Sequence, residues 1–327
     1  MPGRAPAVTE GDQLEHLLES DRRGLLGYCY RMLGSASEAE DAVQEAQLRA
    51  WRGIEGFERR SSLRGWVYRI AHHVCIDMHR SPQRRARPMD LGPASPMASA
   101  ILGEPLSEQA WVRPIGDDRV LDTAADPADV VVARESVRLA FVAALQYLPP
   151  RQRSALILCE VLRWQAVEVA DLLDTSVAAV NSALQRARAT LSEHRTQALD
   201  PRLQPEHEAL LARYVDAFER YDMSALVELL REDVVLSMPP YRLWLQGPTD
   251  LLGWFTGPGS GCRGSRLLPV DINGTGGFGS YKAARPGLWE PWAVQVIEVR
   301  DGRISGHHNF LGPDLFAELG LPPRIEA

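Results

Sequence analysis

The chain contains 327 residues, a length sufficient for about two or three domains. Hydrophobic residues make up 45% of it and charged residues 24%, which are the proportions of folded soluble protein and exclude extensive disorder. The formal net charge of −7 argues against a basic protein that coats nucleic acid or an anionic membrane along its whole length.

Several further classes are excluded by what the sequence lacks. The four cysteines are far apart and form no CxxC pair, which argues against a zinc site and against a disulfide framework. No apolar run approaches the ~18 residues of a membrane helix, and the N-terminus lacks the apolar core of a secretory signal. We therefore expect a cytoplasmic protein with no membrane contact, no metal and no cofactor.

The basic residues are almost all arginine. Of the 36 lysines and arginines, only Lys282 is a lysine. Codon usage in a GC-rich genome is the plainer explanation, and the use of arginine for phosphate contact is the sharper one. Both explanations stay open at the level of the sequence.

Residues 13–82 are predicted to form a helical bundle after a flexible N-terminus at 1–12. Leucines recur at helical spacing from Leu14 to Leu26, with polar residues between them. Two later helices are predicted over 37–51 and 63–79, with Ser37 capping the first and Ser61 or Ser62 capping the second.

Residues 83–128 are predicted to be a long linker. They are rich in proline, alanine, serine and glycine, and their apolar residues follow no steady period. The pairs Ile101-Leu102 and Trp111-Val112 are the apolar patches that can dock locally.

Helical periodicity returns over residues 129–196. The pair Pro149-Pro150 splits this segment, because a proline disfavours helix in the residue before it. Helices are predicted before that pair and then over 151–162, 165–173 and 177–195. A second linker, 197–205, follows and contains Pro201 and Pro205.

Residues 206–327 are predicted to form an α+β domain. Two helices, 206–221 and 224–231, precede short β-rich runs at 234–238, 241–245, 267–272 and 292–299. Asp301-Gly302 between two such runs is a hairpin signal. The glycines of NGTGGFG (273–279) follow a strand without a helix behind them, so we expect a mobile loop or a hairpin and no phosphate-binding loop.

Residues 164–188 have the pattern of a helix-turn-helix. A helix centred on Ala170 meets a short polar turn, and a second helix opens with small residues that permit close crossing. An ordinary helical hairpin in a bundle is the alternative. The residues expected to face outward, the first six toward base edges and the arginines toward phosphate, are Ser176, Ala178, Ala179, Asn181, Ser182, Gln185, Arg186 and Arg188.

Residues 57–80 combine arginines with aromatic residues. Arginines that follow a nucleic-acid backbone, with aromatic rings on which unstacked bases rest, suit single-stranded DNA. The alternative is that Trp66 and Tyr68 belong to the core and the arginines to a solvated face. Helical geometry requires at least one of these two aromatic residues to be core.

Acidic residues cluster over Glu38–Glu45, near the start of a predicted helix, where the helix dipole favours them. A solvated helix face explains them by default, and a docking surface for a basic partner is the alternative.

These three segments, in this order, resemble the extracytoplasmic-function (group 4) sigma factors of the sigma-70 family. The run at 41–51 is similar to region 2.2, which contacts the β′ clamp of RNA polymerase core. The run at 57–80 is similar to regions 2.3 and 2.4, which melt and read the −10 element of promoter DNA. The run at 148–191 is similar to region 4, which binds the −35 element and the β flap.

The resemblance implies a role for each matching residue. Asp41, Gln44 and Glu45 are expected to face polymerase. The outward residues of the helix-turn-helix are expected to contact the −35 element. The residues expected at the −10 element are Arg59, Arg60, Ser61, Ser62, Arg64, Trp66, Arg69, His72, His73 and Arg80.

Residues 206–327 resemble the SnoaL-like domains of the NTF2-like superfamily, whose curved sheet forms a cone with a pocket. The resemblance implies a domain that regulates DNA binding in cis, often without a linked anti-sigma factor. Tyr241, Trp244, Trp254, Trp292 and His307 are the candidate pocket residues, for a small-molecule ligand. No acid–base pair is fixed by local spacing, so we expect no catalytic residue and no enzyme.

The sequence therefore predicts a sigma factor made of two all-α sigma domains and an α+β SnoaL-like domain. One alternative is a regulator that binds DNA without polymerase, and another is a fusion whose last domain is a small-molecule enzyme. We further hypothesise that the glycine-rich loop and the 196–206 linker press the last domain against region 2 or region 4. That domain contains 16 acidic and 11 basic residues, so the basic surface is local.

Overall fold

The computed structural model describes residues 9–59, 61–78, 85–122, 126–193 and 205–326. The chain divides into two compact units that interleave along the sequence. The helical unit is drawn from 1–84, 119–126 and 144–195, and the sheet unit from 85–118, 127–143 and 196–327. Within the described residues, no helix is both long enough and apolar enough to cross a bilayer.

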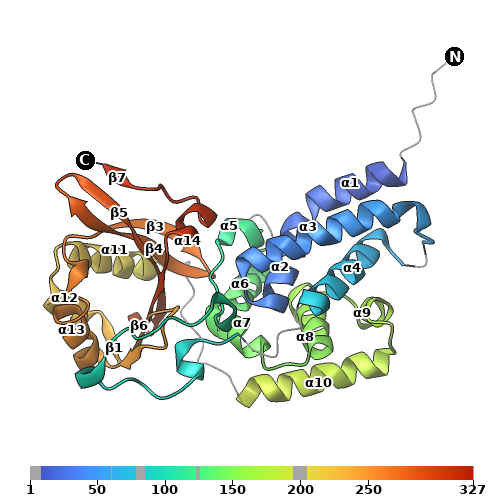
Figure 1. Ribbon diagram of the computed structural model, residues 1–327. Helices are drawn as coiled ribbons and strands as arrows, with labels where there is room; N and C mark the ends of the chain where they lie inside the picture. Colours follow the sequence, from blue (N-terminus) through green and yellow to red (C-terminus); the bar gives the residue numbers. More distant parts are fainter. Residues whose placement is uncertain (1–8, 60, 79–84, 123–125, 194–204, 327) are drawn as a thin grey trace. The chain divides into compact units, whose positions relative to one another are not determined.

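Eight elements make up most of the helical unit (Figure 1). They are α1 (Glu10–Ser20), α2 (Arg22–Leu33), α3 (Ala36–Gly53), α4 (Leu63–Met78), α8 (Pro150–Leu156), the π-helical turn η5 (Ile157–Val161), α9 (Ala166–Leu172) and α10 (Val177–Glu193). Gly34 ends α2 in the left-handed conformation, with φ of 74°. The cap of α3 is Ser35, whose hydroxyl accepts a hydrogen bond from the Glu38 amide, where the sequence favoured Ser37.

Regions 2 and 4 of the resemblance share one core in this unit. The hydroxyl of Tyr28 in α2 lies 2.8 Å from Ser154 Oγ in α8, and both side chains are buried. Tyr68 of α4 is also buried, and its ring centroid lies 4.9 Å from that of Trp164. Tyr68 is therefore the core aromatic that helical geometry required.

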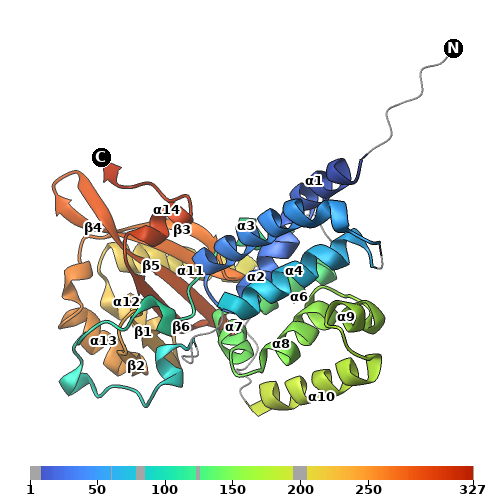
Figure 2. The same ribbon diagram turned by 45° about the vertical axis from the view of Figure 1, so that its right-hand side comes forward.

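The sheet unit contains a curved, mostly antiparallel sheet (Figures 1 and 2). Its strand order is β2 (Trp244–Gln246), β1 (Leu230–Ser237), β6 (Arg303–Leu311), β5 (Leu288–Arg300), β4 (Thr275–Arg285) and β3 (Arg266–Ile272), with β7 (Ile325–Glu326) added to β5. β1 and β6 pair in parallel.

Helices cover both faces of this sheet. They are α11 (Pro205–Glu219), α12 (Met223–Glu228), α13 (Pro248–Thr256) and α14 (Asp314–Glu318). Phe278 on β4 packs on Tyr214 of α11, whereas Tyr281 of the same strand packs on Phe316 of α14. Alternate residues of β4 thus point to opposite faces. The predicted fold class is confirmed at the level of architecture, with helices over the two sigma-like regions and an α+β domain built on one sheet.

The glycine-rich run at 273–279 forms a hairpin and contributes to a strand. Asn273 and Gly274, with φ of 48° and 68°, form the turn between β3 and β4. Gly276, Gly277 and Gly279 lie within β4, where the bulky neighbours leave little room for side chains. Of the two expectations for this run, a mobile loop or a hairpin, the hairpin is confirmed. The glycines permit close packing of the neighbouring side chains.

Residues 85–118 differ from the free linker that their composition predicted. They pack within the sheet unit, where Ser95 N donates to Trp244 O and Leu106 N donates to Pro240 O. Trp111, which sequence analysis marked only as a local patch, is 2% exposed. The helices α6 (Pro127–Val137) and α7 (Leu139–Leu145) follow, and most of their residues belong to the same unit. Burial of scattered apolar pairs thus orders a segment that has no regular period.

Candidate functional site

Helices α9 and α10 form the predicted helix-turn-helix. Asp174, with φ of 49°, turns the chain, and Ser176 caps α10 by accepting a hydrogen bond from the Ala179 amide at 3.2 Å. Val180, Leu184 and Ala187 are the buried residues of α10, and the opposite face of the helix is left open. The eight predicted −35 residues all lie on or beside that face, half-exposed at Ser182 and exposed at the other seven positions.

Both arginines of this set already have partners. Arg186 donates to Ser182 Oγ at 2.6 Å, and Arg188 pairs with Glu160 at 2.6 Å. Both are exposed contacts that exchange readily for phosphate, because surface ion pairs contribute little free energy. The arrangement can place short polar side chains at base edges and guanidinium groups beside the backbone.

The start of the predicted −10 segment lies on the surface of the helical unit. Ser62 is exposed and caps α4 by accepting from the Gly65 amide at 3.0 Å. Arg59 pairs with Glu10 at 2.7 Å. Trp66 is half-buried against Phe57, with ring centroids 5.2 Å apart, so one face of the indole is used in packing. Ser61 is half-buried, and Arg60 and Arg80 lie outside the described residues.

Arg64 is engaged by both halves of the helical unit. Its Nε lies 2.7 Å from Asp21 Oδ2, and its guanidinium carbon lies 5.1 Å from the centroid of the Trp164 ring. This is a cation–π contact across the junction between regions 2 and 4.

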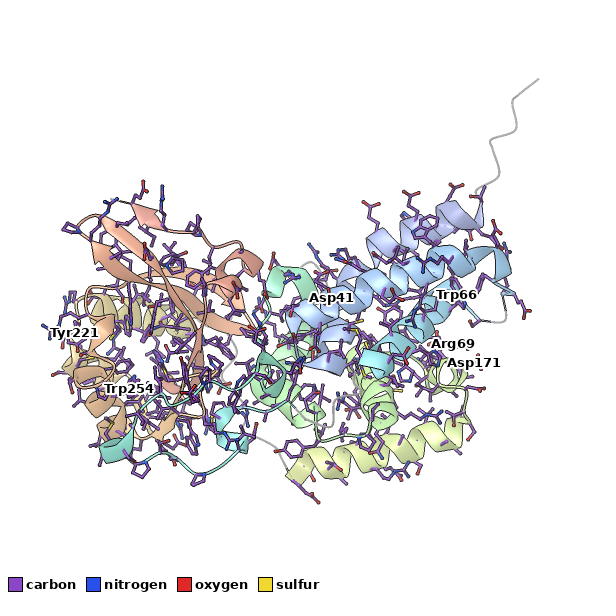
Figure 3. All side chains as sticks on the ribbon, viewed as in Figure 1. Asp41, Trp66, Arg69, Asp171, Tyr221 and Trp254 are labelled. Carbon is purple, nitrogen blue, oxygen red and sulfur yellow. The ribbon has the colours of Figure 1, made fainter. Side chains whose placement is uncertain are left out.

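Arg69 makes a second contact across the same junction. Its Nη2 donates to the backbone oxygen of Asp171 at 2.6 Å, and Figure 3 shows the two residues next to each other. Asp171 lies in α9, the first helix of the helix-turn-helix. Two predicted DNA-contacting arginines are therefore held by region 4.

His72 is buried in the helical unit. It is 3% exposed, and its Nδ1 lies 3.0 Å from the hydroxyl of Tyr28. Burial lowers the pKa of His72 to about 4, with the charges of His73 and Arg151 acting in the same direction. The buried ring is thus neutral and structural, whereas His73 is exposed. Helical neighbours point apart, so one of the two had to turn inward.

The predicted polymerase face lies on α3. Asp41 and Gln44 are exposed, and Glu45 pairs with Arg49 at 2.7 Å. The structure adds two large apolar residues that sequence analysis did not select: Leu48 is 50% exposed and Trp51 45% exposed. Positions 41, 44, 48 and 51 recur at helical spacing, and this spacing was the available signal. An acidic end thus adjoins an exposed apolar end on one helix.

A cavity of about 330 Å³ lies on the concave side of the sheet. Trp254 and Trp292, two of the five predicted pocket residues, line it. Tyr241 and Trp244 are not among the described residues that line it, and Trp244 Nε1 donates to Gly92 O at 3.0 Å instead.

His307 is not among the described residues that line the cavity; it is 1% exposed, and its ring packs on Phe218 and Phe255, which do line it. Its Nε2 lies 2.7 Å from the Tyr214 hydroxyl, and its Nδ1 lies 2.9 Å from Asn309 Nδ2. Burial lowers the pKa of His307 to about 3, so the ring is neutral. Among the described residues we find no group of three or more side chains that could hold a metal ion.

Two family profiles match the chain. The one described as Sigma-70 region 2 matches residues 17–85, and the one described as Sigma-70, region 4 matches residues 138–191. The first contains α2 to α4, and the second runs from α7 into α10.

Curated relatives cover nearly the whole chain. The chain is 43% identical over 329 residues to the ECF RNA polymerase sigma factor SigG of Mycobacterium tuberculosis, covering 99% of this chain and 88% of that protein. It is 29% identical to SigJ of the same organism, covering 94% of each. The crystal structure of SigJ matches with a TM-score of 0.61 at 24% identity, covering 94% of this chain and all of that one.

Proposed function

The chain belongs to the extracytoplasmic-function sigma factors, which direct RNA polymerase to promoters, and we propose that its C-terminal domain restrains promoter binding in cis. Because the chain belongs to this family, the alternative of a regulator that binds DNA without polymerase is rejected. The observation that carries the proposal is the Asn273-Gly274 turn of the sheet unit.

This turn holds two segments of the chain that lead into the sigma regions. Asn273 accepts a hydrogen bond from the Ile115 amide at 3.0 Å and donates to Val137 O at 2.6 Å. The amide of Gly274 donates to Asp117 at 2.8 Å. Residues 115–117 run directly into Arg119, which pairs with Glu40 of region 2, and Val137 directly precedes the region 4 match.

The proposed restraint on promoter binding arises because residues 115–117 and Val137 connect to regions 2 and 4. In the helical unit, region 4 engages Arg64 and Arg69, both of which we propose to act at the −10 element. Separating region 4 from region 2 needs slack in the chain between them. A turn that fixes 115–117 and Val137 removes that slack and so favours the closed arrangement.

The substitution Gly274→Ala tests the proposal. An added Cβ would overlap the carbonyl oxygen of Arg134, and Gly274 has φ of 68°, which disfavours any side chain. Releasing the turn should raise promoter output several-fold, because intramolecular coupling energies are about 1–3 kcal/mol. The measurement is run-off transcription with core polymerase at limiting sigma concentration.

A matched control exists in the same domain. Gly302 occupies an equivalent turn with φ of 67°, and a Cβ there would meet open space. Gly302→Ala therefore adds the same backbone strain without the overlap, and output should stay at the wild-type level. Unchanged or lower output from Gly274→Ala, with Asn273→Ala giving the same result, would contradict a restraining role.

We assign the exposed face of α10 to the −35 element, with base contacts from its short polar residues and phosphate contacts from its arginines. Asn181→Ala should reduce the preference for one −35 base by roughly tenfold, since a bidentate base contact contributes about 1–3 kcal/mol of discrimination. Arg186→Met should instead weaken all promoters alike and lower the salt dependence by about one ion.

The two variants serve as controls for each other. Both positions are on α10 and accessible, so neither substitution disturbs the core. Holoenzyme binding to a set of −35 substitutions at several salt concentrations separates the two effects. If Asn181→Ala weakened every promoter equally, its assignment to a base edge would be overturned.

We propose that the sheet unit works as a binding module and not as an enzyme. Both ring nitrogens of His307 are within hydrogen-bond distance of partners, and its lowered pKa of about 3 makes it a poor base at neutral pH. Enzyme activity can be tested by incubating the full chain with candidate small molecules and measuring product formation.

A further inference from the structure

The cavity in the sheet unit has the size and shape of a ligand site. Its volume of about 330 Å³ falls within the range of about 300–1,000 Å³ that is typical of ligand pockets. Its walls come from α11, α13, the loop after α13, three strands and the segment before region 4. The lining residues include Leu102, Trp254, Lys282 and Trp292.

The single lysine of the chain lines this cavity. Every other basic residue is arginine, yet the position on β4 that faces the cavity is Lys282. Its Nζ lies 3.1 Å from the centroid of the Trp292 ring, which holds the ammonium group in place. Burial lowers the pKa of the Lys282 amine. An anion bound beside the ammonium group would raise this pKa again.

The other polar groups of the cavity add hydrogen-bond donors and no negative charge. None of the described residues that line it is an aspartate or a glutamate. The Tyr214 hydroxyl donates to Gln295 Oε1 at 2.7 Å, so the part of that amide left to serve the cavity is its NH₂ group. Gln295 lies opposite Asn309 in the sheet register, and Ser280 lies one strand away.

The rest of the lining is flat and apolar. Phe218, Trp254, Phe255 and Trp292 supply aromatic rings, and Met238 supplies a polarisable thioether. A single cation set among aromatic rings matches a ligand that has one negative end and a planar apolar body.

We propose that this cavity binds an aromatic carboxylate, with the carboxylate on Lys282 and the ring system between Trp254 and Trp292. Ile101 and Leu102 belong to the segment that connects region 2 to region 4, so an occupied cavity touches that segment directly. Through this wall the ligand alters the restraint on promoter binding, a step that rests on the proposed function above.

The binding step is tested on the full chain with 2-naphthoate and its neutral counterpart 2-naphthamide, by titration calorimetry. The naphthoate should bind about tenfold more tightly than the amide, because a charge-assisted contact is about twice as strong as a neutral one. Lys282→Met should abolish this preference, and Lys282→Arg should retain most of it. Arg285→Met, which removes an exposed cation from the same strand, should have no effect.

Three results would overturn the site: no saturable binding of either compound, equal affinity for both, or a preference that survives in Lys282→Met. Since the amide should still bind Lys282→Met, its binding also reports that the variant is folded.

The coupling step has a separate readout. At a concentration that saturates only the wild type, naphthoate should change wild-type promoter output several-fold and leave the output of Lys282→Met unchanged. Naphthoate that binds but leaves wild-type output unchanged would overturn the coupling alone. Failure of the Gly274→Ala experiment with intact naphthoate binding would overturn the proposed restraint and leave the ligand site standing.

Discussion

Arg153→Met is expected to destabilise the helical unit by about 3 kcal/mol or more. Arg153 is 1% exposed and is the largest fully buried side chain of the described residues. Its guanidinium donates to Gln146 Oε1 at 2.7 Å, to Leu148 O at 3.1 Å and to Met32 O. Burial lowers the pKa of Arg153 to about 10, so the group is still charged at neutral pH.

The reason for this large effect is the set of carbonyls that would lose their donor. Met32 lies at the end of α2, and Leu148 precedes α8, so both oxygens are helix-end groups that need a partner. A methionine replaces the apolar stem of the arginine and donates no hydrogen bond. Each buried carbonyl left without a donor costs about 1–3 kcal/mol.

Denaturant unfolding followed by the helical circular dichroism signal measures this effect. Arg151→Met is the matched control, because Arg151 lies on the same helix and is exposed. That control should leave the midpoint within the error of the wild type. Equal midpoints for the two variants would show that the buried hydrogen bonds contribute no net stability.

Leu48→Asp is expected to weaken binding to core polymerase by about 30-fold or more. We propose the exposed face of α3 as the polymerase surface, with Asp41 and Gln44 at its acidic end and Leu48 and Trp51 at its apolar end. Large apolar anchors at the centre of an interface contribute about 2 kcal/mol or more each. A carboxylate at Leu48 would need to be desolvated without a partner.

The folded chain should tolerate this substitution, because Leu48 is 50% exposed. Leu252→Asp, at a partly exposed apolar position of the sheet unit, is the control and should bind core polymerase as the wild type does. The measurement is competition with labelled wild-type chain for core polymerase. If Leu48→Asp bound core polymerase with wild-type affinity, the proposal that this face of α3 contacts polymerase would be wrong.

Local sequence signals determined the elements and their family. Helical periodicity predicted a helix over 177–195 with Asn181 facing outward, as in α10, because a helix places residues on its faces at a fixed angle along the chain. The Asp301-Gly302 pair predicted the β5–β6 hairpin for a similar reason, since its turn depends on two adjacent residues.

Exposure at particular positions was harder to predict. Histidine is a residue type that can contact DNA, so the sequence does not distinguish His72 from His73. The contact with Tyr28 shows that His72 is buried, whereas His73 is exposed. Leu48 and Trp51 are likewise of apolar types that are usually buried, and yet they lie on the surface. Burial depends on which elements cover a face, and no local pattern contains that information.

The sequence by itself determined that this protein is a sigma factor with an appended α+β domain, because its helices, turns and motifs are encoded within short stretches. Only the tertiary structure decided how the parts are used. Arg64 meets Trp164, Asn273 meets Ile115, and Lys282 shares a cavity with Leu102, in each case across about a hundred residues or more. Such contacts arise from collective packing, whose free energy is spread over the whole core.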